Sequence, residues 1–272
     1  MTTTAEPVIG QLEEVWVSIA DACSGLGPED WERPTECPGW TVRDLLSHLI
    51  GIERSLMGDA APVLAGPVPG HVRNPIGEMN EAWVAARRDR PGDDVVAEFT
   101  AVTARRLDEL RALGPENWEQ VGWSPVGDVP YREFMVVRVF DSWVHEQDAR
   151  RALGRPGGRG GAGERITVER VVSAMGYVVG KKVAPPEGAS IVWEVTGPVP
   201  TSVALTVSGG RARPAGRAPD HPTARFDLDD ETFWRLGCGR VRADEVLSSG
   251  EVRVTGDADL GRRVLDAMAF MV

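Results

Sequence analysis

One helical segment constrains the fold of this chain more strongly than any other part of its sequence. Residues 131–153 carry apolar side chains at helical spacing, and the Gly154 that follows is a typical helix stop. The apolar face, which includes Phe134 and Val137, is interrupted by four polar side chains, Arg138, Asp141, His145 and Asp148. Burying such groups without partners costs several kcal/mol. Other parts of the fold, or a bound ligand, must therefore supply those partners.

The rest of the N-terminal half also predicts helices. Apolar positions recur at helical spacing over residues 5–25, 41–58, 77–89 and 93–113. Thr41 and Asp44 are expected to form a capping box at the start of the second of these helices. The Pro- and Gly-rich segments 25–40 and 59–75 predict loops without regular elements. This half is therefore expected to be a bundle of helices.

The pattern changes after the run RPGGRGGAG, residues 155–163, which is typical of a linker. We expect one domain over residues 1–156 and a second over residues 164–272. The second is expected to begin with a helix over 165–182 and to mix strands with short helices, as in an α+β fold. Its predicted strands cover residues 190–196, 202–207, 224–228 and 251–255, and its predicted short helices 229–236, 243–247 and 257–268.

Composition excludes several classes of protein. The 272 residues carry a formal net charge of −11 without a basic stripe, which argues against nucleic-acid binding. No run of 18 apolar residues predicts a membrane span, and the N-terminus lacks the pattern of a secretory signal, so we expect a cytoplasmic protein. Three widely spaced cysteines predict neither a disulfide framework nor a thiolate-rich zinc site. The oligomeric state stays open.

Asp141 and His145 suggest a metal site. Residues four apart on a helix share one face, so these two side chains can reach the same ion. His48 shares a face with Leu45 and Leu49 of another predicted helix and is expected to point inward as a third ligand. Two imidazoles and one carboxylate match the ligand count of catalytic zinc sites, which keep a fourth position open. The alternative is that both histidines are ordinary core residues held by hydrogen bonds.

Two neighbours of this predicted site, Asp148 and Arg138, have two interpretations each. Asp148 either orients His145 or forms an ion pair with Arg151 or Arg138. Arg138 either holds a carboxylate of a substrate or forms a buried ion pair with Asp141 or Asp148. Glu146 points away from the ligand face and is expected to lie in solvent.

Other reactive side chains give weaker signals. Cys37 sits in a Pro/Gly turn beside Trp40 and could act as a nucleophile, but no base is adjacent in sequence and a structural role is expected. His71 and His221 lie in Pro-rich segments and are expected to be exposed.

Two segments resemble one known family. Residues 31–49, WERPTECPGWTVRDLLSHL, are similar to the W-x-x-P-T-x-C-P-G-W-T-V-R-D-L-x-x-H-L opening of the mycothiol-dependent maleylpyruvate isomerase family. Residues 141–154, DSWVHEQDARRALG, resemble the second signature of that family. The resemblance covers residues 5–156 as a DinB-like four-helix bundle. It extends more weakly to the C-terminal half, as a sterol-carrier-like domain, through residues 233–236, Gly250 and residues 254–260.

The resemblance implies a function as well as a fold. It implies His48, Asp141 and His145 as ligands of a divalent metal ion, with zinc as the expected metal and Trp40 close to it. It further implies mycothiol as cosubstrate, an actinobacterial source, and either cis–trans isomerisation or S-transfer on a small electrophile. The family's isomerases often have glutamate where this chain has Asp141, which puts the substrate in doubt more than the metal. Two alternatives are a small-molecule-binding protein with a structural or vestigial metal site, and a purely structural bundle.

Overall fold

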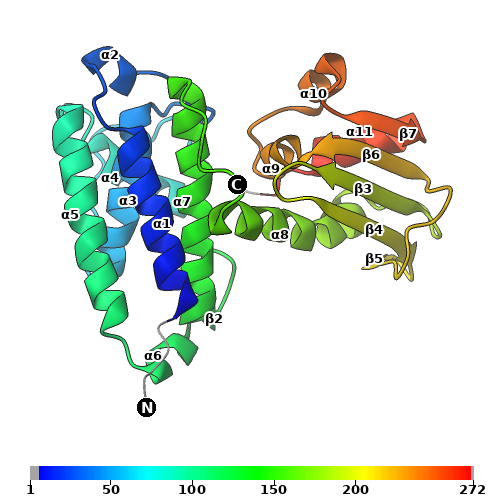
Figure 1. Cartoon of the computed structure of the whole chain (residues 1–272), viewed down its shortest axis with the longest axis horizontal. Helices are drawn as coiled ribbons and strands as arrows, with labels where there is room; N and C mark the ends of the chain where they lie inside the picture. The colour runs from blue at the N-terminus through cyan, green and yellow to red at the C-terminus, as the bar shows by residue number, and fades with distance from the viewer. Residues whose placement is uncertain (1–5, 271–272) are drawn as a thin grey trace. The chain divides into compact units, whose positions relative to one another are not determined.

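The computed structural model describes residues 6–270 and divides the chain into two compact units, Met1–Gly158 and Arg159–Val272 (Figure 1). The first unit is helical and the second combines helices with a five-stranded sheet. This confirms the expected fold class, a helical bundle followed by a smaller α+β domain. Within residues 6–270, none of the helices combines the length and apolar character that a membrane span requires.

Four long helices form the core of the first unit. They are α1 (Pro7–Ala22), α3 (Val42–Leu56), α5 (Gly92–Arg111) and α7 (Tyr131–Leu153). Helix α1 packs against α5 and α7, and α3 packs against the same two helices. Fully buried side chains fill the centre, among them Leu12, Leu45, Leu49, Phe99 and Met135. Each such side chain contributes about 1.5–3 kcal/mol by leaving water. The predicted capping box at Thr41 and Asp44 is confirmed.

Shorter elements connect these helices. They are α2 (Pro28–Trp31), α4 (Pro75–Ala85), α6 (Pro115–Glu119) and the two-residue strands β1 (Val121–Gly122) and β2 (Val129–Pro130), which pair antiparallel. The expectation that segment 25–40 holds no regular element is wrong. Pro28 suits the first turn of α2, and the Asp30 carboxylate accepts a hydrogen bond from the Gly27 N–H at 3.1 Å, so one helical turn is stable there.

The sheet of the second unit has the order β5-β4-β3-β6-β7. Its strands are β3 (Ser190–Thr196), β4 (Thr201–Ser208), β5 (Arg211–Pro214), β6 (Ala224–Asp229) and β7 (Arg253–Gly256). Only the central pair β3 and β6 is parallel; the other pairs are antiparallel. Strand β5, with the sequence RARP, has no β-branched or aromatic side chain, so it lacks the residue types that favoured the other four strands.

Helices pack against this sheet. They are α8 (Ala162–Tyr177), the π-helix η1 (Val178–Val183), α9 (Asp230–Gly237), α10 (Ala243–Ser249) and α11 (Ala258–Ala267). The helix predicted over 165–182 therefore begins earlier and changes to π geometry at Val178. Helix α11 contacts β6, β7 and η1, and α8 contacts β5, α9 and η1.

The segment predicted as a linker is held at both ends. Arg155 donates hydrogen bonds to the carbonyls of Ala22 and Ser24, both at 2.9 Å, and the Gly158 carbonyl accepts one from Trp143. Arg159 instead pairs with carboxylates of the second unit. The boundary between the two units lies between these two sets of contacts. Residues 162 and 163, predicted as linker, belong to α8.

Candidate metal centre

Helices α3 and α7 bring His48, Asp141 and His145 together. One ligand atom from each of the three lies within 4.8 Å of the others. The Nε2 atom of His48 is 3.4 Å from Oδ2 of Asp141, and the Nε2 atom of His145 is 3.7 Å from Oδ1 of the same carboxylate. The two imidazole rings meet edge to face at 4.9 Å between centroids. All three residues suggested by the sequence therefore share one cluster.

His48 is buried, but the described part of the protein supplies no hydrogen bond to its ring. Its side chain is 4% exposed, yet neither Nδ1 nor Nε2 makes a hydrogen bond within residues 6–270. Burial is the main cause that lowers the pKa of His48 from its usual value, against the opposing effect of Asp141. A buried imidazole whose Nδ1 has no partner and whose Nε2 has only a 3.4 Å contact with Asp141 is poorly satisfied by the described residues. This observation disfavours an ordinary core histidine and fits a ligand for a cation.

Asp141 is fixed by an arginine of its own helix. The Nη1 of Arg138 donates to Oδ2 of Asp141 at 2.6 Å. Burial raises the pKa of Asp141, but Arg138 first, and then the imidazoles of His48 and His145, outweigh burial and hold it well below its usual range. Asp141 is therefore a carboxylate, able to bind a cation. Of the two interpretations of Arg138, the structure shows the buried ion pair, here with Asp141. The Nη2 of Arg138 remains a buried donor without a hydrogen-bond partner among the described residues.

His145 is oriented by Asp148, whose Oδ2 lies 3.1 Å from its Nδ1. Because an ionised carboxylate only accepts, Nδ1 carries a hydrogen and Nε2 faces Asp141. Burial lowers the pKa of His145, but the neighbouring Cys37, Asp141 and Asp148 outweigh it and raise the pKa to about 10. A metal ion that binds Nε2 would therefore have to displace a proton.

Cys37 lies closer to the centre than its place in a turn suggested. Its Sγ is 3.2 Å from Oδ2 of Asp148 and 3.8 Å from Nδ1 of His145. The thiol donates to the carboxylate that orients His145, so a supporting role matches its geometry. Nothing in the sequence signals this contact, because 111 positions separate Cys37 from Asp148.

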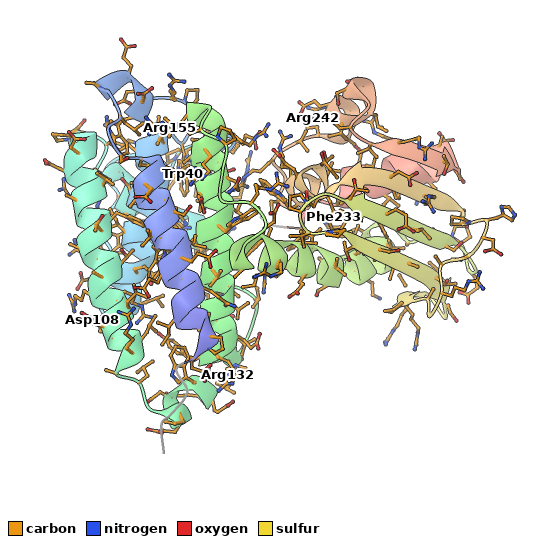
Figure 2. All side chains as sticks on the ribbon, in the orientation of Figure 1. Trp40, Asp108, Arg132, Arg155, Phe233 and Arg242 are labelled. Carbon is orange, nitrogen blue, oxygen red and sulfur yellow. The ribbon has the colours of Figure 1, made fainter. Side chains whose placement is uncertain are left out.

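Trp40 covers both histidines. Its ring centroid is 5.1 Å from that of His48 and 6.1 Å from that of His145. Figure 2 shows Trp40 toward the same end of the helical unit as Arg155. The indole N–H donates to the buried Glu81 at 3.0 Å, and the same carboxylate oxygen lies 3.1 Å from Nε2 of His71. The expectation that His71 is exposed is wrong, since its side chain is 23% exposed and held by Glu81. His221, by contrast, is exposed as predicted.

Glu146 corrects another expectation. It is 1% exposed and accepts hydrogen bonds from Ser18 and Arg150, both at 2.6 Å, so it does not lie in solvent. Helix α1 packs against this side of α7, which buries a second face of a helix whose sequence predicted one buried face.

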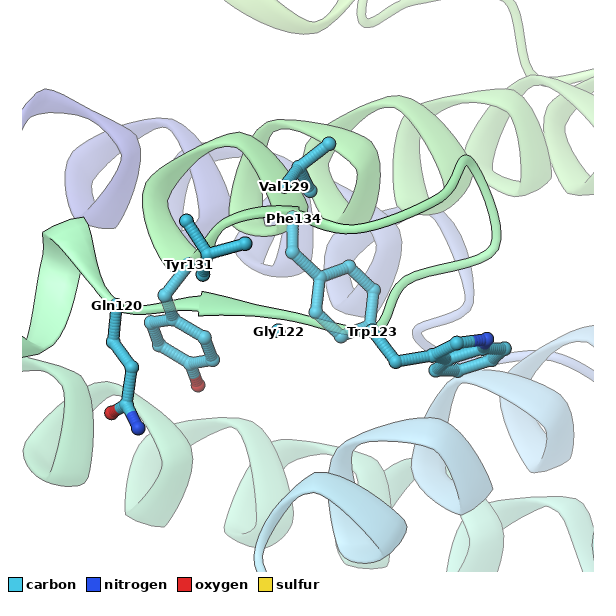
Figure 3. Close-up of a pocket in the computed structure, with 7 residues that line it drawn as sticks. Gln120, Gly122, Trp123, Val129, Tyr131 and Phe134 are labelled. Atoms are coloured by element: carbon cyan, nitrogen blue, oxygen red, sulfur yellow. The ribbon is translucent and has the colours of Figure 1, made fainter.

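A small cavity opens near the start of α7 (Figure 3). It has a volume of about 110 Å³ and is lined by Gln120, Val121, Gly122, Trp123, Val129, Tyr131 and Phe134. None of these residues belongs to the histidine cluster. Phe134 lies seven residues before Asp141, about 10 Å along the helix axis.

Comparison with known proteins identifies the family of this chain. The family model described as the mycothiol maleylpyruvate isomerase N-terminal domain matches residues 12–150, which include Cys37, His48, Asp141, His145 and Asp148. The chain belongs to this family. The model of the SCP-2 sterol transfer family matches residues 179–268. No curated protein sequence matches the chain.

Two crystal structures resemble nearly the whole of this chain. The structure of the mycothiol-dependent maleylpyruvate isomerase has a TM-score of 0.55 and 17% identity, and the match covers 94% of this chain and 98% of that one. A mutant of that enzyme with a histidine changed to alanine matches over the same shares of both chains, at a TM-score of 0.54 and 17% identity. At this identity the likeness shows the fold and not the substrate.

Proposed function

We propose that this protein is a metal-dependent, mycothiol-using enzyme that activates a thiol for addition to a small electrophile. The observation that carries the proposal is the His48–Asp141–His145 cluster, in which a buried imidazole has no hydrogen-bond partner within residues 6–270. The donor set of two imidazole nitrogens and one carboxylate suits zinc. Family membership supports mycothiol as the cosubstrate.

The residues around the cluster have distinct roles in this proposal. His48, Asp141 and His145 would hold the ion, which would lower the pKa of a bound thiol so that thiolate could form near neutral pH. Asp148 keeps the hydrogen of His145 on Nδ1 and leaves Nε2 for binding. Trp40 covers the two imidazoles and limits access of water. The unpaired Nη2 of Arg138 offers a donor to an anionic group of a substrate.

The same thiol supports two reactions. In isomerisation, the sulfur bonds to one carbon of an activated cis double bond, and the π electrons move onto the conjugated carbonyl. Rotation about the resulting single bond and loss of thiolate then restore the double bond in the trans form. In S-transfer, the carbon next to the carbonyl takes a proton instead, and the carbon–sulfur bond remains. The protein contributes positioning and charge stabilisation in both cases.

The test combines metal analysis with turnover. Purified protein should hold about one divalent ion per chain, and His145→Ala should lose it. Wild-type protein should also consume mycothiol with at least one of a panel of small electrophiles, including a cis-enoyl acid. Metal-free wild-type protein after purification without chelators, and without uptake of added zinc, would overturn the proposal.

A second candidate is a protein that binds a small apolar molecule without converting it. The match of residues 179–268 to the SCP-2 sterol transfer family favours this alternative. Such a binder would show affinity for an apolar ligand but no ligand-dependent loss of mycothiol, so the same turnover assay separates the two.

A further inference from the structure

A chain of buried charged side chains runs from the ligand cluster into the bundle core. Arg138 bridges two carboxylates, since its Nη1 donates to Asp141 at 2.6 Å and its Nε donates to Oε1 of Glu53 at 2.8 Å. The other oxygen of Glu53 accepts from Nε of Arg106 at 3.2 Å. Arg106 in turn donates to the hydroxyl of Tyr131, which lines the small cavity near the start of α7.

These groups are too deeply buried to be incidental surface pairs. Glu53 is fully buried, and Arg106 and Arg138 are each 4% exposed. Three helices contribute, with Glu53 on α3, Arg106 on α5 and Arg138 on α7. Buried ion pairs are costly to assemble, and replacement by apolar residues is often neutral for stability. A role beyond stability therefore offers a better explanation for their presence next to the cluster.

The geometry of Asp141 suggests that role. Aspartate has a short side chain, and its carboxylate must face Nε2 of both histidines at once. Arg138 holds one of its oxygens, and Glu53 holds Arg138 through a separate nitrogen of the same planar guanidinium group. A planar group bound at two of its nitrogens cannot rotate freely. Arg138, which holds the Asp141 carboxylate, is thus itself held by a residue on a different helix, Glu53.

We propose that Glu53 is a positioning residue for the metal centre, acting through Arg138 to orient Asp141. The inference rests on the proposed metal site but names a residue that does not touch the ion. Loss of the Glu53 charge would weaken cation binding in two ways. It frees Arg138, and with it Asp141, and it removes a negative charge near the cation.

Glu53→Gln tests this proposal against a matched control, Glu98→Gln. Like Glu53, Glu98 is a carboxylate of this bundle that binds several arginines, including Arg87 at 2.7 Å, although it is only partly buried. None of its recorded partners touches the histidine cluster. We expect Glu53→Gln to weaken Co²⁺ binding by about 10–100-fold, measured by competition with a chromogenic chelator. Glu98→Gln should change the affinity by less than about twofold.

The visible absorption spectrum of bound Co²⁺ provides a readout that general destabilisation does not move. It should change in Glu53→Gln and stay as in wild type in Glu98→Gln. If Glu53→Gln does not fold, Arg138→Lys is the variant to test. The lysine ammonium group keeps the positive charge but lacks the separate guanidinium nitrogens that reach both carboxylates. This variant should weaken Co²⁺ binding by about 10-fold.

The possible results distinguish a failure of the role proposed for Glu53 from a failure of the proposed metal site. Wild-type affinity and spectrum in Glu53→Gln, or in Arg138→Lys where the first variant does not fold, would overturn the role of Glu53 while leaving the metal site intact. Absence of Co²⁺ binding in wild-type protein would overturn the metal site, and the role of Glu53 with it.

Discussion

The Oδ2 atom of Asp148 lies 3.1 Å from Nδ1 of His145, three residues earlier on α7. This contact turns Nδ1 of His145 toward Asp148 and Nε2 toward Asp141. A carboxylate on the far nitrogen of a metal-binding imidazole orients the ring and raises its basicity. The sequence left the partner of Asp148 open between His145 and two arginines, and the structure shows the contact with His145.

Asp148→Ala should therefore weaken zinc binding by about 10–100-fold. Competition with a chromogenic chelator measures the change. Asp148→Asn, which keeps an acceptor oxygen, should retain most of the affinity. Equal affinities in wild type and Asp148→Ala would show that Asp148 does not support the site.

Cys37→Ala should retain thiol-dependent turnover within about 10-fold of wild type, since in the proposed function the cosubstrate supplies the reacting sulfur and Cys37 donates to Asp148. The measurement is mycothiol consumption at saturating electrophile. Cys37→Ser, which keeps a donor, serves as the control. Complete loss of activity in the alanine and serine variants, with metal content intact, would identify Cys37 as a nucleophile instead.

His48→Leu should abolish binding of a metal ion without a matching loss of stability. Neither ring nitrogen of His48 makes a hydrogen bond within the described structure. Oδ2 of Asp141, which lies 3.4 Å from Nε2 of His48, keeps its hydrogen bond from Arg138, so the replacement leaves no protein group unpaired. Removing an unsatisfied buried group relieves about 1–3 kcal/mol, which offsets the lost contacts with Trp40 and His145. Urea unfolding of chelator-treated protein should thus give a free energy within about 1 kcal/mol of wild type. Unchanged metal content would favour the purely structural bundle.

Glu98 should make the bundle sensitive to acid. Burial raises its pKa, but Arg87 and Arg90 outweigh burial and lower the pKa from 4.5 to about 2. A carboxyl with a depressed pKa in the folded state stabilises the protein above its unfolded-state value and loses that effect as pH falls toward the folded-state value. Because solvent screens the exposed Arg54 and Arg90, the stabilisation is expected to be about 1–2 kcal/mol.

The corresponding measurement compares Glu98→Gln with wild type by urea unfolding from pH 7 to pH 3. The difference in unfolding free energy should be constant at neutral pH and shrink below about pH 4.5. A difference that does not depend on pH would rule out the charge of Glu98 as its cause.

Arg159→Met should destabilise the second unit. Arg159 pairs with Asp230 at 2.6 Å, with Glu231 at 2.7 Å and with the fully buried Glu164. Its loss leaves buried carboxylates without a cation, which costs about 3–5 kcal/mol. Hydrogen exchange should show reduced amide protection in α8 and α9. Unchanged protection there would mean that the carboxylates find other partners.

Local patterns account for the parts of the fold that the sequence predicted. The i, i+4 spacing of Asp141 and His145 is a property of one helix, so their shared face follows from α7 alone. The capping box at Thr41 and the central strand Ser190–Thr196 likewise depend on neighbours in sequence. The placement of His48 beside them required two long motifs that resemble a known family, because no local rule pairs α3 with α7.

The sequence by itself determined the helical bundle, the α+β second half, and the residue types that can bind a metal. Only the tertiary structure decided that Cys37 donates to Asp148, that Glu53 holds Arg138, and that Glu146 is buried. These features depend on how the helices rotate and pack against one another. Side-chain periodicity states which face of a helix is apolar, but it does not state which polar side chain of a distant helix meets that face.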